Sequence, residues 1–534
     1  MIKAERRDFQ LERQPGLPSP SNQCNEKYEL SSHAEKRVTS SSYPCNQWLN
    51  RALRKSFTAS KCIWHKLSVL ALSIIAATLT TSCTVERTES RSPLLQYVEK
   101  SDISYSWRLV QQVTVNGAEI IELRLYSQTW QDQLWKHRLY LIKPARLTIE
   151  SQALLTLVGG RWNEAFDQSD GPLPLPETSG LFAQISEQIG SVHVILAQVP
   201  FQPLFDRNED ELIAYTFDRY LATQDPEWPL LLPMVKSAVR AMDASQEAAR
   251  EIWGVELDNF TLLGGSKRGW TAWLTAAADH RVTAVAPMVI DALNMAAHFP
   301  HQTEVWGAPS VEIRPYTERN LDTALSTEFG RELREIVDPF EYRNLLLQPK
   351  LIVNATNDAY FPVDSINLYW DELEGPKYTL LLPNQGHDAD DFGRLIPSLR
   401  SLHRHAAGLD QMPQLDWQYK QSPQGVRICI SADTRPERVR VWTAVSSDRD
   451  FRNDIWRMSE ISVSSTIIAY DHHQESQAYT SLFAEIIFAS AAGDYALSTT
   501  PVVIGPSESE LDIFSAVSTA NACDSVLNPS TSRN

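Results

Sequence analysis

The nine residues Thr261–Gly269 (TLLGGSKRG) constrain the fold of this chain more than any other stretch. Strand-forming residues lead to two glycines and a serine, and the Ala- and Trp-rich segment Trp270–Ala278 that follows has a helical composition. We therefore expect a buried strand, a tight turn at Ser266 and a helix, with Gly264 and Gly265 providing the backbone freedom that such a turn needs. A serine at this place is exposed above the free amides of a helix N-terminus.

Ser266 has two interpretations, a nucleophile for acyl transfer or the N-cap residue of the helix. A nucleophilic serine needs a histidine base and a carboxylate that orients the base. Asp358 follows the apolar run Lys350–Ala355, and His387 follows the apolar run Tyr378–Leu382. The alternatives are an Asx turn at Asp358 and a surface-loop histidine. The order Ser, Asp, His, each just after a predicted strand, favours a catalytic triad.

A site for the developing negative charge is expected at an earlier strand end. The run Ala153–Val158 leads into Gly159 and Gly160, whose amides are unobstructed by side chains. An amide near Gly160 and the N–H of Lys267 would form the oxyanion hole. The alternative is a glycine turn that binds no ligand.

Three charged residues near the expected site have open roles. We expect Arg268 to be structural, with its side chain beneath the turn. The neighbouring Lys267 either contacts an anionic substrate or forms an ion pair. Asp291 follows the apolar run Val282–Ile290, so it is a rival for the acid role and a candidate for a substrate contact.

The remaining pattern predicts the domain organisation. Residues 93–410 alternate apolar strand runs with helical segments, which predicts an α/β fold with a mostly parallel sheet covered by helices on both faces. Residues 292–340 interrupt this alternation and predict a cap over the site. Residues 411–505 alternate polar and apolar positions without a long helix, which predicts a β-sandwich-like domain. The Ser-, Asn- and Asp-rich residues 506–534 are expected to be a disordered tail.

Composition excludes some classes of function. The chain has 534 residues, 15 tryptophans and a net charge of −17, with no basic stripe, which argues against a nucleic-acid partner. We find no phosphate-binding loop and no cysteine/histidine spacing of a metal site, so we expect neither cofactor nor metal. The adjacent pair His472 and His473 is interpreted as a solvated loop.

The N-terminal region predicts export. The apolar stretch Leu67–Leu79 follows basic residues and is short for a membrane span, so residues 61–83 resemble a signal peptide. Small residues before Cys83 resemble a lipoprotein cleavage site with a lipid on that cysteine, although Leu79 lies four residues before it. A short membrane anchor is the alternative. We expect residues 1–60 to be a disordered or misassigned leader. In an oxidising compartment, Cys429 and Cys523 would be able to pair.

Several stretches resemble the PhoPQ-activated pathogenicity-related protein family. The resemblance covers about residues 93–505, and the block GGSKRGW is specific to the family. It implies an α/β-hydrolase-like fold, an exported protein and a triad of Ser266, Asp358 and His387, but it implies no substrate. Relatives in social amoebae resemble secreted proliferation repressors. The stretches that carry the resemblance are 127–137, 209–221, 228–246, 264–295, 349–365, 381–387 and 439–452.

Two functions follow as hypotheses. The first is an exported, lipid-anchored, periplasmic or secreted serine hydrolase that cleaves a small-molecule or peptide substrate, with esterase and peptidase variants both open. The second is a secreted binding or signalling protein on a hydrolase scaffold, in which the triad is vestigial and the C-terminal β domain binds the partner.

Overall fold

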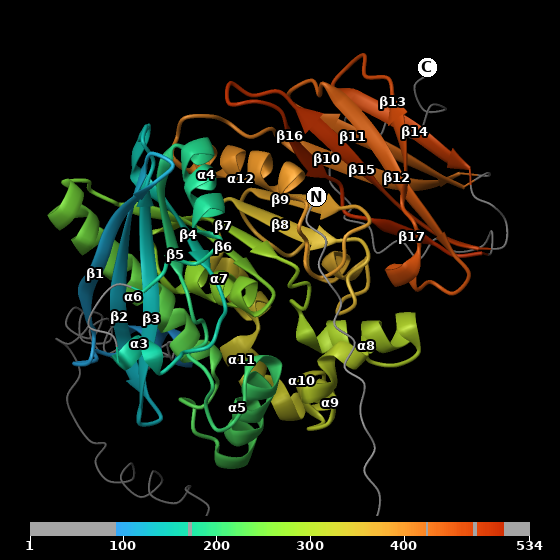
Figure 1. Ribbon diagram of the computed structural model, residues 1–534. Helices are drawn as coiled ribbons and strands as arrows, with labels where there is room; N and C mark the ends of the chain where they lie inside the picture. Colours follow the sequence, from blue (N-terminus) through green and yellow to red (C-terminus); the bar gives the residue numbers. More distant parts are fainter. Residues whose placement is uncertain (1–91, 169–172, 423–424, 474–477, 507–534) are drawn as a thin grey trace, which may run out of the picture. The chain divides into compact units, whose positions relative to one another are not determined.

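The computed structural model describes residues 92–168, 173–422, 425–473 and 478–506. The first nine strands form a central sheet in the order β1-β2-β3-β5-β4-β6-β7-β8-β9 (Figure 1). In chain order they are β1 (Ser106–Val115), β2 (Ala118–Trp130), β3 (Gln133–Lys143), β4 (Ile149–Leu157), β5 (Ser191–Leu196), β6 (Asn259–Gly265), β7 (Val282–Met288), β8 (Lys350–Ala355) and β9 (Lys377–Leu382).

The strands from β5 to β9 in this order are parallel, whereas β1, β2 and β3 are antiparallel. Every residue of β5 and β8 is buried. Strands that are apolar on both faces need a cover on both faces. Because the carboxyl ends of parallel strands lie along one edge of a sheet, the loops after β6, β8 and β9 leave the sheet at the same edge.

Helices provide this cover. The helices α4 and α12 pack on one face and contact each other, while α6 and α7 pack together on the other face (Figure 1). Helix α6 is buried on all sides from Leu231 to Val239, whereas its C-terminal half buries one face that includes Met242 and Ala249. The helices outside the cap are α2 (Pro93–Glu99), α3 (Ala165–Gln168), α4 (Ser179–Ile189), α5 (Glu209–Thr223), α6 (Leu231–Trp253), α7 (Lys267–Ala278) and α12 (Phe392–Ala406).

The segment between β7 and β8 is the helical cap. Helix α5 packs against its helices α9, α10 and α11, so α5 belongs to the same layer. Asp338 accepts backbone hydrogen bonds from Met295 and Phe340, which ties the start of the cap to its end. The cap elements are α8 (Met295–Trp306), η1 (Val311–Ile313), α9 (Arg314–Thr317), α10 (Leu321–Leu325), η2 (Glu328–Gly330), α11 (Arg331–Val337) and η3 (Pro339–Leu345).

The C-terminal strands form two sheets. A three-stranded sheet has the order β10-β11-β14, and the other strands extend the central sheet, because β16 pairs with β9 at Ser498 and Thr379. Buried side chains of both layers, such as Ile428 and Val441, share one apolar core. The elements are β10 (Leu415–Ser422), β11 (Gly425–Ala432), β12 (Arg438–Ser446), η5 (Phe451–Asn453), β13 (Arg457–Ile461), β14 (Ile467–His473), β15 (Tyr479–Phe488), β16 (Tyr495–Ser498) and β17 (Val502–Ile504).

The predicted fold class is confirmed: the protein has a large α/β sheet with helices and a C-terminal sheet domain. Three details differ from the expectation. The helix after the turn begins at Lys267 rather than Trp270. His472 and His473 lie in β14, not in a loop. The C-terminal layer also joins the central sheet edge to edge, which residue alternation cannot predict because pairing partners are distant in sequence.

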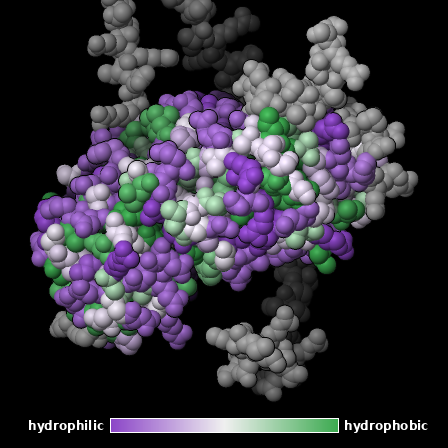
Figure 2. Space-filling model, turned by 90° about the horizontal axis from the view of Figure 1, so that it is seen from above, coloured by the Kyte–Doolittle hydropathy of each residue, from purple (hydrophilic) through white to green (hydrophobic). Residues whose placement is uncertain are grey.

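The surface is mostly polar. On the face shown in Figure 2, hydrophilic residues predominate and hydrophobic residues form small separate groups. The exposed large hydrophobic side chains, among them Val311, Phe329 and Ile455, come from separate elements. None of the helices in the described ranges has the length and hydrophobicity needed to cross a membrane.

Candidate active site

Ser266 lies on a strained turn between β6 and α7. Its φ of 54° and ψ of −126° belong to the positive-φ region that side-chain-bearing residues rarely adopt. A Cβ atom at Gly264 would lie 2.3 Å from the carbonyl oxygen of Arg268, and one at Gly269 would lie 2.8 Å from the carbonyl oxygen of Gly264. The turn therefore requires glycine at 264 and 269. Gly265, which was expected to be needed, has open space around it.

The three predicted triad residues meet at the expected edge of the sheet. His387 Nε2 is 2.9 Å from Ser266 Oγ, and His387 Nδ1 is 2.9 Å from Asp358 Oδ2 and 3.0 Å from Oδ1. Asp358 is only 4% exposed, while the His387 side chain is 21% exposed. A buried carboxylate, a partly accessible imidazole and a hydroxyl thus form one continuous hydrogen-bonded chain.

Tyr360 covers the imidazole. Its ring centroid is 4.1 Å from that of His387, with an angle of 30° between the planes. The backbone N–H of Tyr360 also donates to Asp358 Oδ1 at 2.8 Å. The stacked ring and this hydrogen bond restrict the rotation of the base and of the acid. The only sequence signal for Tyr360 is its place two residues after Asp358.

The loops that carry the acid and the base are held by the C-terminal domain. The amide of Asn357 donates to the carbonyls of Phe451, Arg452 and Asp454, at 3.1, 3.2 and 2.8 Å. The amide of Asn384 makes two hydrogen bonds with the backbone of Trp456, at 3.0 and 2.8 Å. We call residues 449–456, between β12 and β13, the clamp segment.

Lys267 and Arg268 both bind carboxylates at the start of α5. Lys267 Nζ is 2.8 Å from Asp210 Oδ2. The guanidinium of Arg268 makes a two-pronged pair with Glu209 at 2.6 and 2.7 Å and also donates to the Val199 carbonyl. The structural role expected for Arg268 agrees with this geometry. The charge of Lys267 is compensated, so an anionic substrate gains no free cation there.

The ion pair between Arg268 and Glu209 is connected by hydrogen bonds of Gln202 to the loop at Gly160, where an oxyanion hole is predicted. Gln202 bonds to Glu209 at 2.6 Å and donates to the Gly160 carbonyl at 3.1 Å. Gly160 has a φ of 119°, and a Cβ atom at Gly159 would lie 2.3 Å from the Arg268 guanidinium. Gly160 follows β4, which pairs with β6, so this loop and Ser266 leave neighbouring strands at one edge. The acidic residues in the first turn of α5 are the sequence feature from which partners for Lys267 and Arg268 were predictable.

Asp291 does not have the position expected of a substrate contact. Its carboxyl is 3% exposed, accepts a hydrogen bond from the Tyr369 hydroxyl and is absent from the cavity beside Ser266. Burial raises the pKa of Asp291 to about 7, despite the hydrogen bond from Tyr369. The acid partner of His387 is Asp358, so the rival role of Asp291 has no support in the geometry.

A small cavity opens beside the serine. It has a volume of about 50 Å³ and is lined by Ser266, by the residues after β7 and β8, and by the cap. Its walls are mostly aromatic and aliphatic side chains, with the Lys267–Asp210 pair and Tyr316 at one side. His387 does not line it.

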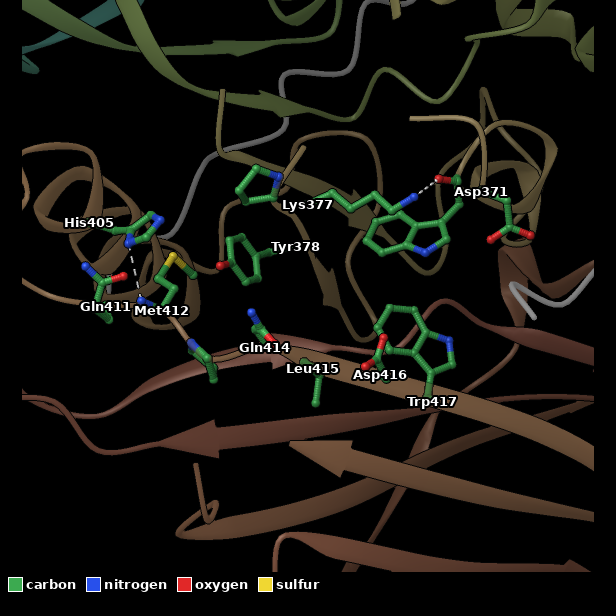
Figure 3. Close-up of a pocket in the computed structure, with 13 residues that line it drawn as sticks. Asp371, Lys377, Tyr378, His405, Gln411, Met412, Gln414, Leu415, Asp416 and Trp417 are labelled. Carbon is green, nitrogen blue, oxygen red and sulfur yellow. Dashed lines mark hydrogen bonds between the residues drawn. The ribbon is translucent and has the colours of Figure 1, made fainter. Parts of the chain in front are cut away.

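A larger cavity lies away from the triad. It has a volume of about 780 Å³ and lies between residues 370–378 and residues 411–417, where β9 faces β10 (Figure 3). Its tryptophans, Trp370 and Trp417, are buried against each other, with ring centroids 5.4 Å apart. None of the triad residues lines this cavity.

Other predicted positions have simpler outcomes. Cys83 and the signal-like segment lie outside the described residues, as does Cys523. Cys429 is buried and disulfide-bonded. Across the described ranges, no group of three or more His, Cys, Asp or Glu side chains is placed to hold a metal ion.

Residues 94–452 match the family described as PhoPQ-activated pathogenicity-related protein. The chain belongs to this family. Autocrine proliferation repressor protein A of Dictyostelium discoideum is similar to it, with 31% identity over 413 residues that cover 72% of this chain and 79% of that protein. With its parallel sheet and serine turn, this family member has a hydrolase-type scaffold.

Two solved structures show a distant likeness. Acetyl xylan esterase from Paenibacillus sp. R4 has a TM-score of 0.40 and 16% identity, covering 57% of this chain and 91% of that chain. S-formylglutathione hydrolase from Agrobacterium tumefaciens has a TM-score of 0.37 and 10% identity, covering 56% of this chain and 99% of that chain. Likenesses this distant say nothing about the substrate.

Proposed function

We propose that this protein is an exported serine hydrolase that cleaves an ester or amide with Ser266 as nucleophile. The observation that carries the proposal is the hydrogen-bonded chain from Asp358 through His387 to Ser266, with all donor–acceptor distances between 2.9 and 3.0 Å. The positive φ of Ser266 supports it, because backbone strain of this kind costs on the order of 1–3 kcal/mol and persists where the surrounding structure enforces it.

Each triad residue has a defined task in the proposed reaction. His387 Nε2 accepts the proton of Ser266 Oγ as the oxygen attacks the substrate carbonyl. Asp358 accepts a hydrogen bond from His387 Nδ1–H, which fixes the tautomer and stabilises the imidazolium. The imidazolium then gives its proton to the leaving group, and a water molecule, deprotonated by His387, releases the acyl group from Ser266.

The negative charge of the tetrahedral intermediate needs donors near Ser266. As the first residue of α7, Lys267 has a backbone N–H with no acceptor inside the helix. We assign this amide and an amide of the Gly160 loop to the oxyanion hole. Loss of one such donor typically reduces kcat by about 100- to 1,000-fold.

Export is the second element of the proposal. Its support is the signal-like segment of residues 61–83, with Cys83 as the site of a lipid. Mass spectrometry of the mature N-terminus in the native host tests both parts. A mature chain that begins at lipidated Cys83 would establish the anchor, whereas an intact N-terminus in the cytoplasm would refute export.

A fluorophosphonate probe tests the nucleophile. We expect wild-type protein to be labelled, and S266A and H387A to lose labelling, since the probe reacts with an activated serine. The exposed residue Ser151 provides a control, and S151A should be labelled like wild type. Equal labelling of wild type and S266A, or no labelling of wild type, would refute the hydrolase assignment.

A secreted signalling protein with a vestigial triad is the second candidate. Its support is the relative whose name is autocrine proliferation repressor protein A. The two candidates differ at Ser266. If S266A loses fluorophosphonate labelling but keeps the full effect of the secreted protein on cell growth, the signalling function does not use hydrolysis.

A further inference from the structure

In the proposed reaction, the cavity beside Ser266 would take the acyl side of the scissile bond. The leaving-group oxygen must reach His387 Nε2 to receive its proton. Ser266 lines the cavity but His387 does not. A substrate group in this cavity is therefore the one that stays attached to Ser266 after the leaving group departs.

The size of the cavity limits that group. A cavity needs on the order of 10–15 Å³ to hold one water-sized atom. The cavity of about 50 Å³ therefore holds roughly three to five non-hydrogen atoms. An acetyl or propionyl group fits these limits, whereas an octanoyl chain exceeds them.

The walls that set this size are fixed. Trp270 donates its indole N–H to the carbonyl of Val337 at 2.6 Å, and Tyr316 donates its hydroxyl to Asp210 at 3.0 Å. These bonds cross between α7, α5 and the cap. Opening the cavity for a long chain would break these hydrogen bonds and leave buried polar groups without partners, which is unfavourable.

The chemistry of the walls favours an uncharged acyl group. The ammonium of Lys267 is paired with Asp210, so the cavity has no net charge from this pair. His298, at the start of the cap, is buried in the wall, and burial lowers its pKa to about 3, which keeps the ring neutral. A carboxylate or ammonium on the acyl group would lose its hydration without meeting an uncompensated opposite charge at the Lys267–Asp210 pair.

We propose that the substrate is an ester or amide of a short, uncharged acyl group of two or three carbons. This inference rests on the proposed hydrolase function and adds the acyl class to it. The cap side chains that close the cavity determine this specificity, and Ile313 is one of them. Ile313 lines the cavity and is 7% exposed, whereas Val311, in the same 3-10 turn, is 78% exposed and does not line it.

A chain-length series tests the proposal. With p-nitrophenyl acetate, butyrate and octanoate, we expect the wild-type kcat/KM to fall at least tenfold from acetate to octanoate. I313A should raise the octanoate-to-acetate ratio at least fivefold, because the removed carbons extend the cavity. V311A, a matched aliphatic truncation outside the cavity, should keep the wild-type ratio. F299A, at a half-buried position in the wall, provides a second enlargement should I313A fail to fold.

The outcomes separate this proposal from the hydrolase assignment. If Ser266 reacts with the fluorophosphonate but octanoate is hydrolysed as well as acetate, or no ester is hydrolysed, the short-acyl proposal is overturned while the activated serine remains. If acetate is preferred but neither I313A nor F299A changes the ratio, the cavity is not the acyl site. Absence of fluorophosphonate labelling overturns both.

Discussion

At the scale of single residues, the turn at Ser266 depends on contacts that the motif alone does not reveal. Gly269 permits a close approach to the Gly264 carbonyl, and Arg268 fills the space that a side chain at Gly159 would need. The guanidinium of Arg268 thereby connects the nucleophile turn with the start of α5. For the proposed hydrolase, we therefore expect Arg268 to be a positioning residue, which acts through the turn and the loop at Gly160 rather than on the substrate.

We predict that R268A lowers both stability and turnover. Arg268 is largely buried but Glu209 is 39% exposed, so the loss should be about 1–3 kcal/mol, between the values for exposed and buried pairs. The kcat/KM for p-nitrophenyl acetate should fall as well, mostly through a lower kcat. R250A removes an ion pair in which Nε of Arg250 donates to both carboxylate oxygens of Glu256, with both side chains exposed, and it should leave both quantities nearly unchanged. Urea unfolding and steady-state kinetics measure the two effects, and unchanged kcat in R268A would contradict the positioning role.

At the scale of elements, the C-terminal domain contributes to the site although it supplies no triad residue. The clamp segment 449–456 receives the side chains of Asn357 and Asn384, which lie in the two loops that carry the acid and the base. Trp456, at the end of this segment, is buried against Phe483 of β15. The domain therefore holds the loops of Asp358 and His387 from outside the central sheet.

We predict that N357A reduces kcat about tenfold with little change in KM, because a small displacement of the acid and base loops disturbs the geometry of proton transfer. Asn367 offers a matched control. Its amide donates to the Pro501 carbonyl at 2.9 Å, so it also ties the α/β body to the C-terminal region, but away from the triad loops. N367A should lower the melting temperature to a similar extent and keep kcat. Equal effects of both substitutions on kcat would argue against a specific clamp.

At the scale of the whole molecule, three parts meet at one buried carboxylate. Asp364, after β8, accepts from His301 of the cap at 2.8 Å and from Arg449 of the clamp segment at 3.0 Å. Burial by itself would raise the pKa of Asp364, but the hydrogen bonds and charges of His301 and Arg449 lower it below the usual range. The charged form of Asp364 therefore stabilises the contact between cap, body and C-terminal domain.

We predict that D364N lowers the free energy of unfolding by about 3–5 kcal/mol at pH 7, the usual loss when one partner of a buried pair is removed. Because the folded-state pKa of Asp364 lies below the unfolded value, its contribution is present above the usual carboxyl range and is lost as the pH falls through the folded-state pKa. The difference between wild type and D364N should narrow in acid. D471N, at the exposed pair with Arg427, should cost less than about 1 kcal/mol. Urea unfolding at several pH values measures the difference in free energy of unfolding between wild type and D364N. A difference that does not change with pH would contradict a stabilising role for the charged form of Asp364.

Local patterns predicted much of the central sheet. Near-continuous apolar runs mark β4, β6, β8 and β9, because these strands are buried on both faces. The same patterns did not predict β5 or α12. In β5, His193 interrupts the apolar run, and its imidazole is buried by bonding to Thr156 of the neighbouring strand. Only the tertiary partner explains a polar residue there.

The sequence by itself determined the strand–turn–helix at Ser266 and the order of Ser266, Asp358 and His387, because residue spacing and composition are properties of the local chain. Only the tertiary structure decided between the open roles of Lys267 and of Asp291 and identified Glu209 as the partner of Arg268. It also decided the pairing of β16 with β9 and the contact of the clamp segment with the loops of Asp358 and His387. These features are contacts between residues far apart in the chain. Whether a charge meets solvent, substrate or an opposite charge depends on which distant segment packs against it.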